Sequence, residues 1–451
     1  MRAALLSLMM MGLVLTAVAQ DTAPPPPAPA EMILPQPATP GAGQFNVMDY
    51  GVKGDGKTDD TAAFQKALDT AGDAGGGILQ VPVGAYAIHG HLRVPDKVTL
   101  QGVWTRPLWS KPIDFKGLSV LLAYEGKGKM EGDPFILLQN SSTLQGISVF
   151  YPEQINSLEP HPYPWTVAGK GDNCTIVNCT LFNPYQAVDF GSLGGGRHYV
   201  NGLYGQPLFL GLYIDSCFDV GRVEDVHFWP FWSGTDLKEP VCTFMREKGT
   251  AFLIAQTDGQ MFFNCFCIYY RYGFKFIDTL GKKPDGSPRR GQGSGVYTNC
   301  YPDICKTSIY VEEVQPNSGI SFINGMIMGG VEVAETNKGQ VKFTACGFWA
   351  NRDQETHAKL LGRGIAIFEG CHFTNWDRVN QGLPCIDANN KSLIVTGCEF
   401  SADNPDTKLK VKLGANIESA IITSNRMVNG VEIKKECPPE SDIQIGLNTA
   451  K

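Results

Sequence analysis

Beyond residue 140 the sequence repeats a six-residue pattern: apolar, any, small, anchor, any, apolar. Such short alternating runs predict β-strands. The small position is mostly Gly, Asn, Asp or Ser, which suit the left-handed backbone of a sharp bend between two strands. We align ten copies, whose anchors are Ile147, Cys179, Val226, Cys265, Cys300, Gly325, Cys346, Cys371, Cys398 and Asn425. The last five intervals, of 21 to 27 residues, each fit one structural repeat, and stacked Asn residues would form a turn ladder.

The N-terminal part of the chain has a different pattern. Residues 45–94 predict a strand, a Gly/Asp turn, an amphipathic helix from about Asp59 to Ala71, a Gly run that ends the helix, and two further strands. Ala63, Phe64, Ala67 and Leu68 share one face of this helix, which needs an apolar surface to cover.

The order of these pieces carries a resemblance. DYG-x-x-GDG-x-TDDT, followed by GGG-x-(I/L)-x-(V/I)-P-x-G-x-Y, resembles the N-terminal entry of the pectate-lyase-like superfamily, which includes polygalacturonase-related and rhamnogalacturonase/epimerase-like proteins. The resemblance implies an all-β fold, a single-stranded right-handed parallel β-helix whose N-terminal α-helix caps the first coil. With the ten repeats, we expect about ten coils.

Domain boundaries follow from composition. Arg2, an apolar run and an A-x-A pattern ending at Ala19 predict a signal peptide over residues 1–19, and hence a secreted or periplasmic protein. Residues 20–44 predict a Pro-rich linker, and residues 45–451 one β-helix domain. No later apolar run is long enough to predict a membrane span. A net charge of −7 gives no basic stripe, so nucleic acid is not an expected partner.

Six of the thirteen cysteines occupy anchor positions. Residues stacked in register keep their Cβ atoms about 4.8 Å apart, beyond the usual 3.5–4.5 Å of a disulfide. We therefore expect a column of buried thiols that act as small apolar side chains. Some disulfides and a metal site remain as alternatives, the metal site being the less favoured because no CxxC pair is present.

The intervals of 47, 39, 35 and 32 residues exceed one repeat and indicate insertions, where binding clefts are commonly built. Their aromatic rings suit stacking on sugars, although some of them would simply pack loops onto the β-helix. The predicted substrate-binding residues are Tyr151, Glu153, Arg197, His198, His227, Trp229, Trp232 and Lys275.

A third strand in each coil would line the face that holds the active groove in pectinase-like families. Period-two alternation points one column of side chains outward: Asp189, Tyr213, Lys275, Tyr310, Glu332, Asp387 and Glu432. Asp215 and Asp258 follow neighbouring strands, so Asp189, Asp215 and Asp258 are the predicted catalytic cluster. Paired carboxylates hydrolyse glycosidic bonds, one as acid and the other as base or nucleophile. The alternative is that each Asp caps a turn.

Three functions remain open. The leading interpretation is a secreted glycoside hydrolase that acts on a polysaccharide, either acidic or neutral. The second is a polysaccharide lyase or uronate epimerase, for which calcium is a possible cofactor; otherwise we expect no cofactor and no metal. The third is a carbohydrate-binding β-helix without activity. The polygalacturonase motifs and a pectate-lyase calcium cluster are not recognisable, although Arg222, Arg246 and Arg271 keep a lyase open. The oligomeric state, monomer or trimer, is also open.

Overall fold

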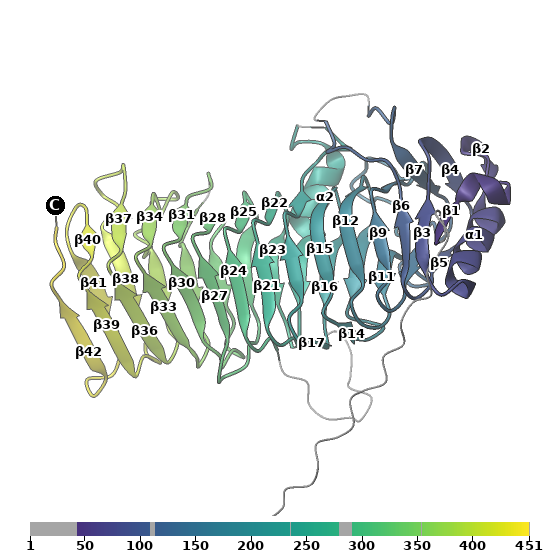
Figure 1. The fold of residues 1–451 in the computed structure, drawn as a ribbon. Coiled ribbons are helices and arrows are strands. Elements are labelled where there is room, and N and C mark those ends of the chain that lie inside the picture. The colour runs from purple at the N-terminus through teal and green to yellow at the C-terminus, as the bar shows by residue number, and fades with distance from the viewer. Residues whose placement is uncertain (1–42, 109–112, 235, 279–290, 353, 451) are drawn as a thin grey trace, which may run out of the picture. The chain divides into compact units, whose positions relative to one another are not determined.

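The computed structural model describes residues 43–108, 113–234, 236–278, 291–352 and 354–450. The predicted signal peptide and nearly all of the predicted linker lie outside these residues. The described chain winds through three parallel sheets, once per coil, so the predicted parallel β-helix is confirmed. Figure 1 shows the coils stacked from α1 (Thr61–Asp73) to β42.

The first and second sheets share the long strands β12 and β15 and together contain 22 strands. Fifteen belong to the first sheet: β1 (Gln44–Asn46), β3 (Gly77–Gln80), β6 (Val98–Gln101), β9 (Thr143–Gln145), β12 (Thr175–Leu181), β15 (Tyr199–Gly205), β18 (Arg222–Glu224), β21 (Gln260–Phe263), β24 (Gly295–Thr298), β27 (Ile320–Ile323), β30 (Val341–Thr344), β33 (Ile365–Glu369), β36 (Ser392–Thr396), β39 (Ser419–Thr423) and β42 (Asp442–Gly446).

The second sheet follows the first in each coil and also includes the C-terminal halves of β12 and β15. Its other strands are β2 (Asp55–Asp59), β4 (Gly84–Ile88), β7 (Ser119–Ala123), β10 (Ser148–Phe150), β19 (His227–Phe228), β22 (Phe266–Ile268) and β25 (Tyr301–Asp303). A five-stranded sheet continues the same face: β28 (Met326–Met328), β31 (Gly347–Trp349), β34 (His372–Thr374), β37 (Glu399–Ser401) and β40 (Arg426–Met427).

The third sheet has 13 strands: β5 (Leu92–Val94), β8 (Ile136–Leu138), β11 (Trp165–Gly169), β13 (Gln186–Phe190), β16 (Leu210–Ile214), β20 (Thr250–Ile254), β23 (Tyr272–Phe276), β26 (Thr307–Val311), β29 (Val331–Val333), β32 (Ala358–Leu360), β35 (Ile386–Ala388), β38 (Leu409–Leu413) and β41 (Glu432–Lys435). Short elements complete the fold: the 3-10 helix η1 (Val47–Tyr50), α2 (Pro240–Lys248), β14 (Gly195–Gly196) and β17 (Cys217–Phe218).

The turn between the first and second sheets is the one that the repeat predicts. All ten small positions before the anchors have left-handed backbone, with φ between 51° and 67°: Gly146, Asn178, Asp225, Asn264, Asn299, Asn324, Ala345, Gly370, Gly397 and Ser424. The Asn324 side-chain amide donates to Asn299 Oδ1 at 2.8 Å, which is one rung of the predicted ladder.

The number of coils is thirteen to fifteen, so the prediction of about ten was too low. The coils before residue 140 lack the repeat. One coil is also hidden in the 47-residue interval, where Gly202 has φ 68° and Leu203 is buried opposite Cys179. That interval is therefore two ordinary coils, and the predicted insertion there is wrong. The 39-residue interval does carry an insertion, since it contains α2.

The N-terminal helix α1 starts two residues later than predicted and buries Phe64, Ala67, Leu68 and Ala71 against the first coils. The Phe64 ring meets the Tyr86 ring edge-on at 5.8 Å. The Asp60 carboxylate accepts hydrogen bonds from the backbone amides of Lys53 and Gly54, at 2.7 and 3.0 Å, which ties the helix start to the preceding turn. The predicted cap is confirmed.

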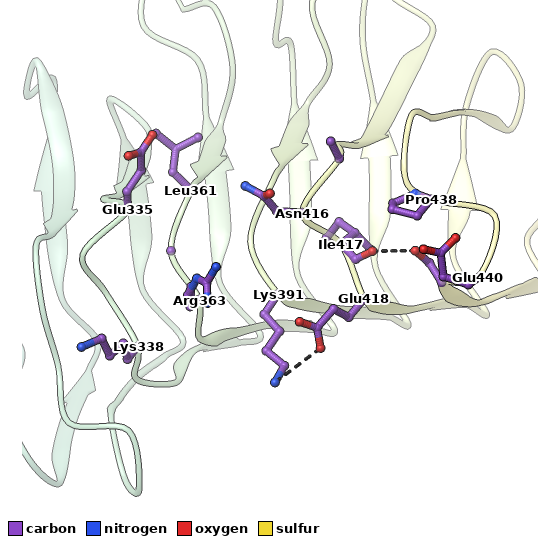
Figure 2. A pocket seen from close by; sticks show the side chains of 13 residues that line it. Glu335, Lys338, Leu361, Arg363, Lys391, Asn416, Ile417, Glu418, Pro438 and Glu440 are labelled. Carbon is purple, nitrogen blue, oxygen red and sulfur yellow. Dashed lines mark hydrogen bonds and ion pairs between the residues drawn. The ribbon is translucent and has the colours of Figure 1, made fainter.

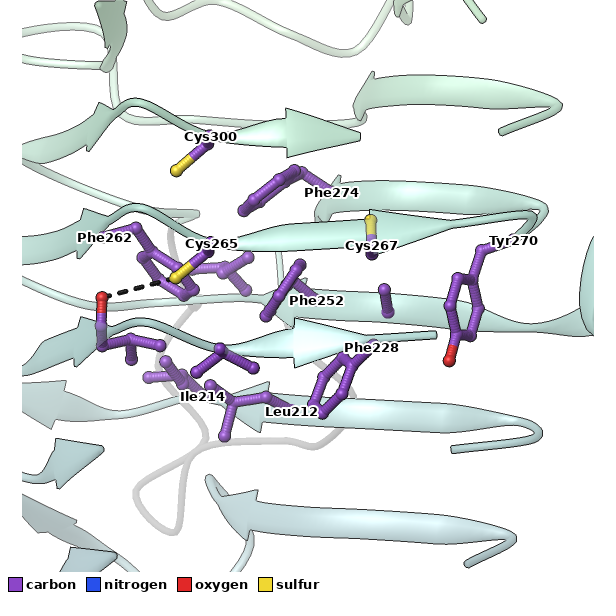
Figure 3. Close-up of a cluster of buried hydrophobic side chains, with 14 of the residues drawn as sticks. Leu212, Ile214, Phe228, Phe252, Phe262, Cys265, Cys267, Tyr270, Phe274 and Cys300 are labelled. Carbon is purple, nitrogen blue, oxygen red and sulfur yellow. Dashed lines mark hydrogen bonds between the residues drawn. The ribbon is translucent and has the colours of Figure 1, made fainter. Parts of the chain in front are cut away.

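The six anchor cysteines are free thiols with at most 1% of their surface exposed. Figure 3 shows Cys265 and Cys300 pointing into the interior beside stacked Phe rings, among them Phe252 and Phe274 at 4.6 Å. Burial raises the pKa of Cys179 to about 12, so this thiol stays protonated. The predicted column of buried thiols is confirmed.

Candidate functional site

The outward column predicted on the third sheet is confirmed by the strand register. Asp189 lies opposite Tyr213, and Lys275 lies between Leu253 and Tyr310, which is in turn opposite Glu332. Further along, Asp387 lies between Lys359 and Lys412, while Glu432 lies opposite Leu409 beside a register irregularity. The alternating partners, such as Val188 and Phe274, fill the interior. From Lys275 onward this column is at least partly exposed and carries polar side chains, whereas Asp189, Tyr213 and Leu253 in the earlier coils are covered.

Two of the three predicted catalytic carboxylates lie close together but have structural partners. Asp189 is 2% exposed and accepts from the amides of Gly191 and Ser192 at 2.7 and 2.9 Å. Asp215 is 1% exposed and accepts from the Tyr213 hydroxyl at 2.8 Å. Burial, opposed by these amides and assisted by the charge of Asp215, raises the pKa of Asp189. The hydrogen bonds match the turn-capping alternative.

The third predicted carboxylate, Asp258, has a different environment. It is exposed in the turn after β20, and its amide N–H donates to the Cys217 carbonyl at 3.3 Å. Asp258 therefore differs in exposure from the buried pair Asp189 and Asp215.

Two predicted sugar contacts are placed in the interior, which corrects their expected surface location. Tyr151 is 1% exposed because it continues the inward positions of Ile147 and Val149; its hydroxyl bonds to Thr166 Oγ1 at 2.9 Å. His198 is 2% exposed and stacks on Phe190 at 5.0 Å. Burial lowers the pKa of His198 to about 4, so its ring is neutral at pH 7. Trp232 is partly buried against the core.

Glu153 and Arg197 lie on the surface in ion pairs. Glu153 pairs with Lys127 at 3.1 Å, and Arg197 pairs with Asp172 and, at 3.1 Å, with Asp219. Each charge is therefore already matched by a neighbour. Exposed pairs of this kind contribute little stability and leave both side chains able to exchange partners.

His227 and Trp229 lie on the second sheet, not on the face of the predicted carboxylates. The His227 ring lies 5.7 Å from Tyr204 and 4.5 Å from Phe266, and Trp229 lies 5.6 Å from Phe266. Burial lowers the pKa of His227 to about 4. His227 and Trp229 thus lie on a different surface from the predicted carboxylates.

The third sheet also carries a compact group of cations and phenols, which we call the Lys275 cluster: Arg271, Tyr272, Lys275 and Tyr310. Lys275 Nζ lies 5.0 Å from the centre of the Tyr272 ring and 5.7 Å from that of Tyr310. The two rings are 5.1 Å apart, and the Arg271 guanidinium lies 5.1 Å from Tyr272. All four side chains are at least partly exposed.

The environment moves two pKa values in opposite directions. Burial lowers the pKa of Lys275, and the charge of Arg271 assists this shift. Burial, assisted by the charge of Glu312, raises the pKa of Tyr310, which keeps the phenol protonated. A base beside an acid is the arrangement that general acid–base catalysis requires. Sequence reasoning placed both residues in the outward column but named only Lys275, because it searched for carboxylates.

A cavity lies elsewhere, among turns that follow third-sheet strands of the C-terminal coils. Its volume is about 880 Å³, and Lys338, Arg363 and Lys391 line it on successive coils (Figure 2). Glu335, Glu418 and Glu440 line it as well, and Lys391 pairs with Glu418 at 3.4 Å. The three cations and three carboxylates of this lining balance in charge, whereas the Lys275 cluster presents two cations beside two phenols, so we prefer the Lys275 cluster.

Across the described ranges, no group of three or more His, Cys, Asp or Glu side chains is placed to hold a metal ion. In the same residues no helix has the length and apolar character needed to cross a membrane.

Comparison with known proteins gives a short but specific match. Residues 44–190 match the family described as rhamnogalacturonase A/epimerase, pectate lyase-like. A 47-residue segment is 55% identical to alginate lyase 7 of Azotobacter vinelandii, covering 10% of this chain and 6% of that protein. A 65-residue segment is 42% identical to the mannuronan C5-epimerase AlgE4 of the same organism, covering 13% and 12%. The matched segments are thus a small part of these relatives.

Among solved structures, the pre-mature gene product 12 of bacteriophage phi29 has a TM-score of 0.51 at 12% identity, covering 90% of this chain and 56% of that one. This likeness concerns the fold alone. The match thus assigns residues 44–190 to the pectate lyase-like, rhamnogalacturonase A/epimerase family, and the three parallel sheets continue the same β-helix fold through the rest of the described chain.

Proposed function

We propose that this protein acts on a uronate-containing polysaccharide and removes the proton at C5 of the uronate, as a lyase or a C5-epimerase. The observation that carries the proposal is the Lys275 cluster, in which an amine of lowered pKa lies beside a phenol of raised pKa. The relatives that match over short segments, named alginate lyase and mannuronan C5-epimerase, support the same chemistry.

The chemistry needs three groups. A cation must neutralise the uronate carboxylate, which makes the C5 proton more acidic, and Arg271 is the charged side chain of the cluster suited to this task. The Lys275 amine takes the proton. The Tyr310 hydroxyl then protonates the leaving O4 atom, which gives an unsaturated product, or returns a proton to C5 from the opposite side, which inverts the sugar.

Hydrolysis, our leading interpretation from the sequence, has weaker support. Its proposed catalytic carboxylates, Asp189 and Asp215, are almost fully buried. They accept hydrogen bonds from backbone amides and from a tyrosine hydroxyl. No described observation gives them access to a water molecule or a glycosidic oxygen. The export predicted from residues 1–19 fits an enzyme that meets polysaccharide outside the cell, and it remains a proposal.

The test is incubation with polymannuronate, polyguluronate, polygalacturonate and an uncharged glucan. Ultraviolet absorbance of unsaturated uronate reports a lyase, proton NMR of the C5 configuration reports an epimerase, and reducing ends without absorbance report a hydrolase. We expect one of the first two signals, on a uronate polymer only. Reducing ends without absorbance, or activity on the glucan alone, would overturn the proposal.

A further inference from the structure

The second sheet carries a groove that the proposed chemistry does not use. Its volume is about 250 Å³, and it spans β22, β25, β28 and β31. It is lined by Phe266, Tyr301, Asp303, Met326, Met328 and Trp349. It lies around the corner from the Lys275 cluster, because β25 and β26 are consecutive strands of one coil on different sheets.

The lining is apolar and aromatic, with one charge. Phe266, Tyr301 and Met326 are register neighbours or near-neighbours on successive coils, so their side chains form one continuous row about 4.8 Å apart. Trp349 is 44% exposed, and its indole N–H donates to His372 Nε2 at 3.2 Å, which fixes the orientation of the ring. Flat, exposed rings held in one orientation suit the apolar C–H face of a sugar ring.

Asp303 supplies the polar contact in the groove. Its carboxylate is partly buried, and burial raises its pKa. No Lys or Arg lines the groove, so the carboxylate has no cation there to pair with. A partly buried carboxylate without a cation is stabilised most by hydrogen bonds from hydroxyl groups, and it repels a second carboxylate in the same space.

The row continues toward the N-terminus. Phe266 lies next to His227 at 4.5 Å, and His227 lies next to Tyr204 at 5.7 Å, so aromatic rings follow one another along the stack. A ligand with a repeating apolar face matches such a row better than a single small molecule. The volume fits a single sugar ring better than a drug-sized molecule, which needs about 300–1,000 Å³.

We infer that this groove binds an uncharged stretch of polysaccharide, with pyranose rings on Tyr301 and Trp349 and sugar hydroxyls on Asp303. The inference does not depend on the proposed lyase or epimerase activity. The two faces then take different parts of a heteropolymer, or different polymers of one matrix: uronate at the Lys275 cluster and neutral sugar in the groove.

The test is isothermal titration of the folded full-length protein with cellohexaose, mannohexaose and a mannuronate hexasaccharide. We expect at least one neutral hexasaccharide to bind, and Trp349→Ala and Tyr301→Ala each to weaken it by several-fold to about tenfold, the range of aromatic pairs. Phe263→Ala, at a 49% exposed ring on the first sheet, is the matched control and leaves binding unchanged.

Lys275→Met also leaves neutral-sugar binding unchanged, which separates the two faces. The inference is overturned if neither neutral hexasaccharide binds, or if Trp349→Ala and Tyr301→Ala bind as tightly as the unaltered protein. It is likewise overturned if sedimentation shows self-association that Trp349→Ala abolishes, because a second copy of the chain would then be the occupant.

Discussion

Two faces of the same coils differ sharply in chemistry. On the third sheet, Lys275 and Arg271 lie among the phenols of Tyr272 and Tyr310, so the surface combines cations with proton donors. On the second sheet, Tyr301 and Trp349 lie beside a lone carboxylate, so the surface is apolar with one acceptor. Each coil of a β-helix contributes one strand to each of three sheets. Alternate side chains of a strand point outward or into the shared core, so each sheet can carry different side chains on its outer surface. One scaffold thus presents a face of cations and phenols and a face of apolar and aromatic side chains.

The largest expected effect is a loss of turnover when the third-sheet face is altered. Lys275→Met removes the proposed base and is expected to lower turnover on uronate polymer by 10² to 10⁴-fold, the range for loss of a general base. Lys359→Met is the matched control. Lys359 is exposed in the same outward column, and Glu332 lies between it and Tyr310. Its turnover is expected to stay within a few-fold. Initial rates by ultraviolet absorbance or NMR decide between the two outcomes.

A change in the cap affects both faces together. Phe64→Ala deletes a fully buried ring that packs on Tyr86, and we expect about 3–5 kcal/mol of destabilisation. Urea unfolding measures this loss. A loss below roughly 0.5 kcal/mol, the usual size of a surface effect, would mean that α1 does not cover the first coils.

Acid is expected to weaken the scaffold under both faces. Burial lowers the pKa of His198 and of His357 to about 4, below the 6.5 of an exposed ring. The unfolded chain therefore binds more protons, and stability that is present above pH 6.5 is lost as the pH falls from 6.5 to 4. The loss is about 3 kcal/mol per ring at completion. Urea unfolding at several pH values measures it, and His357→Gln should flatten the pH dependence; an unchanged slope would contradict the burial.

The smallest effect sharpens the comparison from the other side. Trp349→Ala is expected to leave turnover on a short uronate oligosaccharide within a few-fold, because the ring lies outside the Lys275 cluster. The same assay used for Lys275→Met measures it. A loss of 10²-fold would show that the two faces form one site.

Sequence patterns predicted the bends better than the number of coils. The left-handed turn needs a small or amide residue, and that local requirement is visible at Asn178 or Gly397 without any knowledge of the fold. The coil that contains Gly202 was not recognised in the sequence, because Gly205 occupies the position where other coils have an inward apolar side chain. Its register neighbours there are Leu181 and Phe228. The pattern depends on that side chain, although the backbone turn does not.

Side-chain direction could be predicted from alternation, whereas the pKa shifts could not. Alternation correctly placed Lys275 and Tyr310 on the outward column because both lie inside regular strands. Tyr151 continues the two-residue spacing of the inward Ile147 and Val149, so alternation predicts its burial; it was assigned to the surface because its ring suits a sugar. The opposed pKa shifts of Lys275 and Tyr310 arise from packing between coils, which residue order alone does not contain.

The measurement that bears most directly on the central claim follows the C5 proton in heavy water. Oligouronate is incubated with the unaltered protein, with Lys275→Met and with Lys359→Met, and the products are examined by proton NMR. The account predicts solvent deuterium at C5, or loss of the C5 proton to a new double bond, with the unaltered protein and Lys359→Met but not with Lys275→Met. Cleavage with the C5 proton retained, or exchange that persists in Lys275→Met, would contradict it.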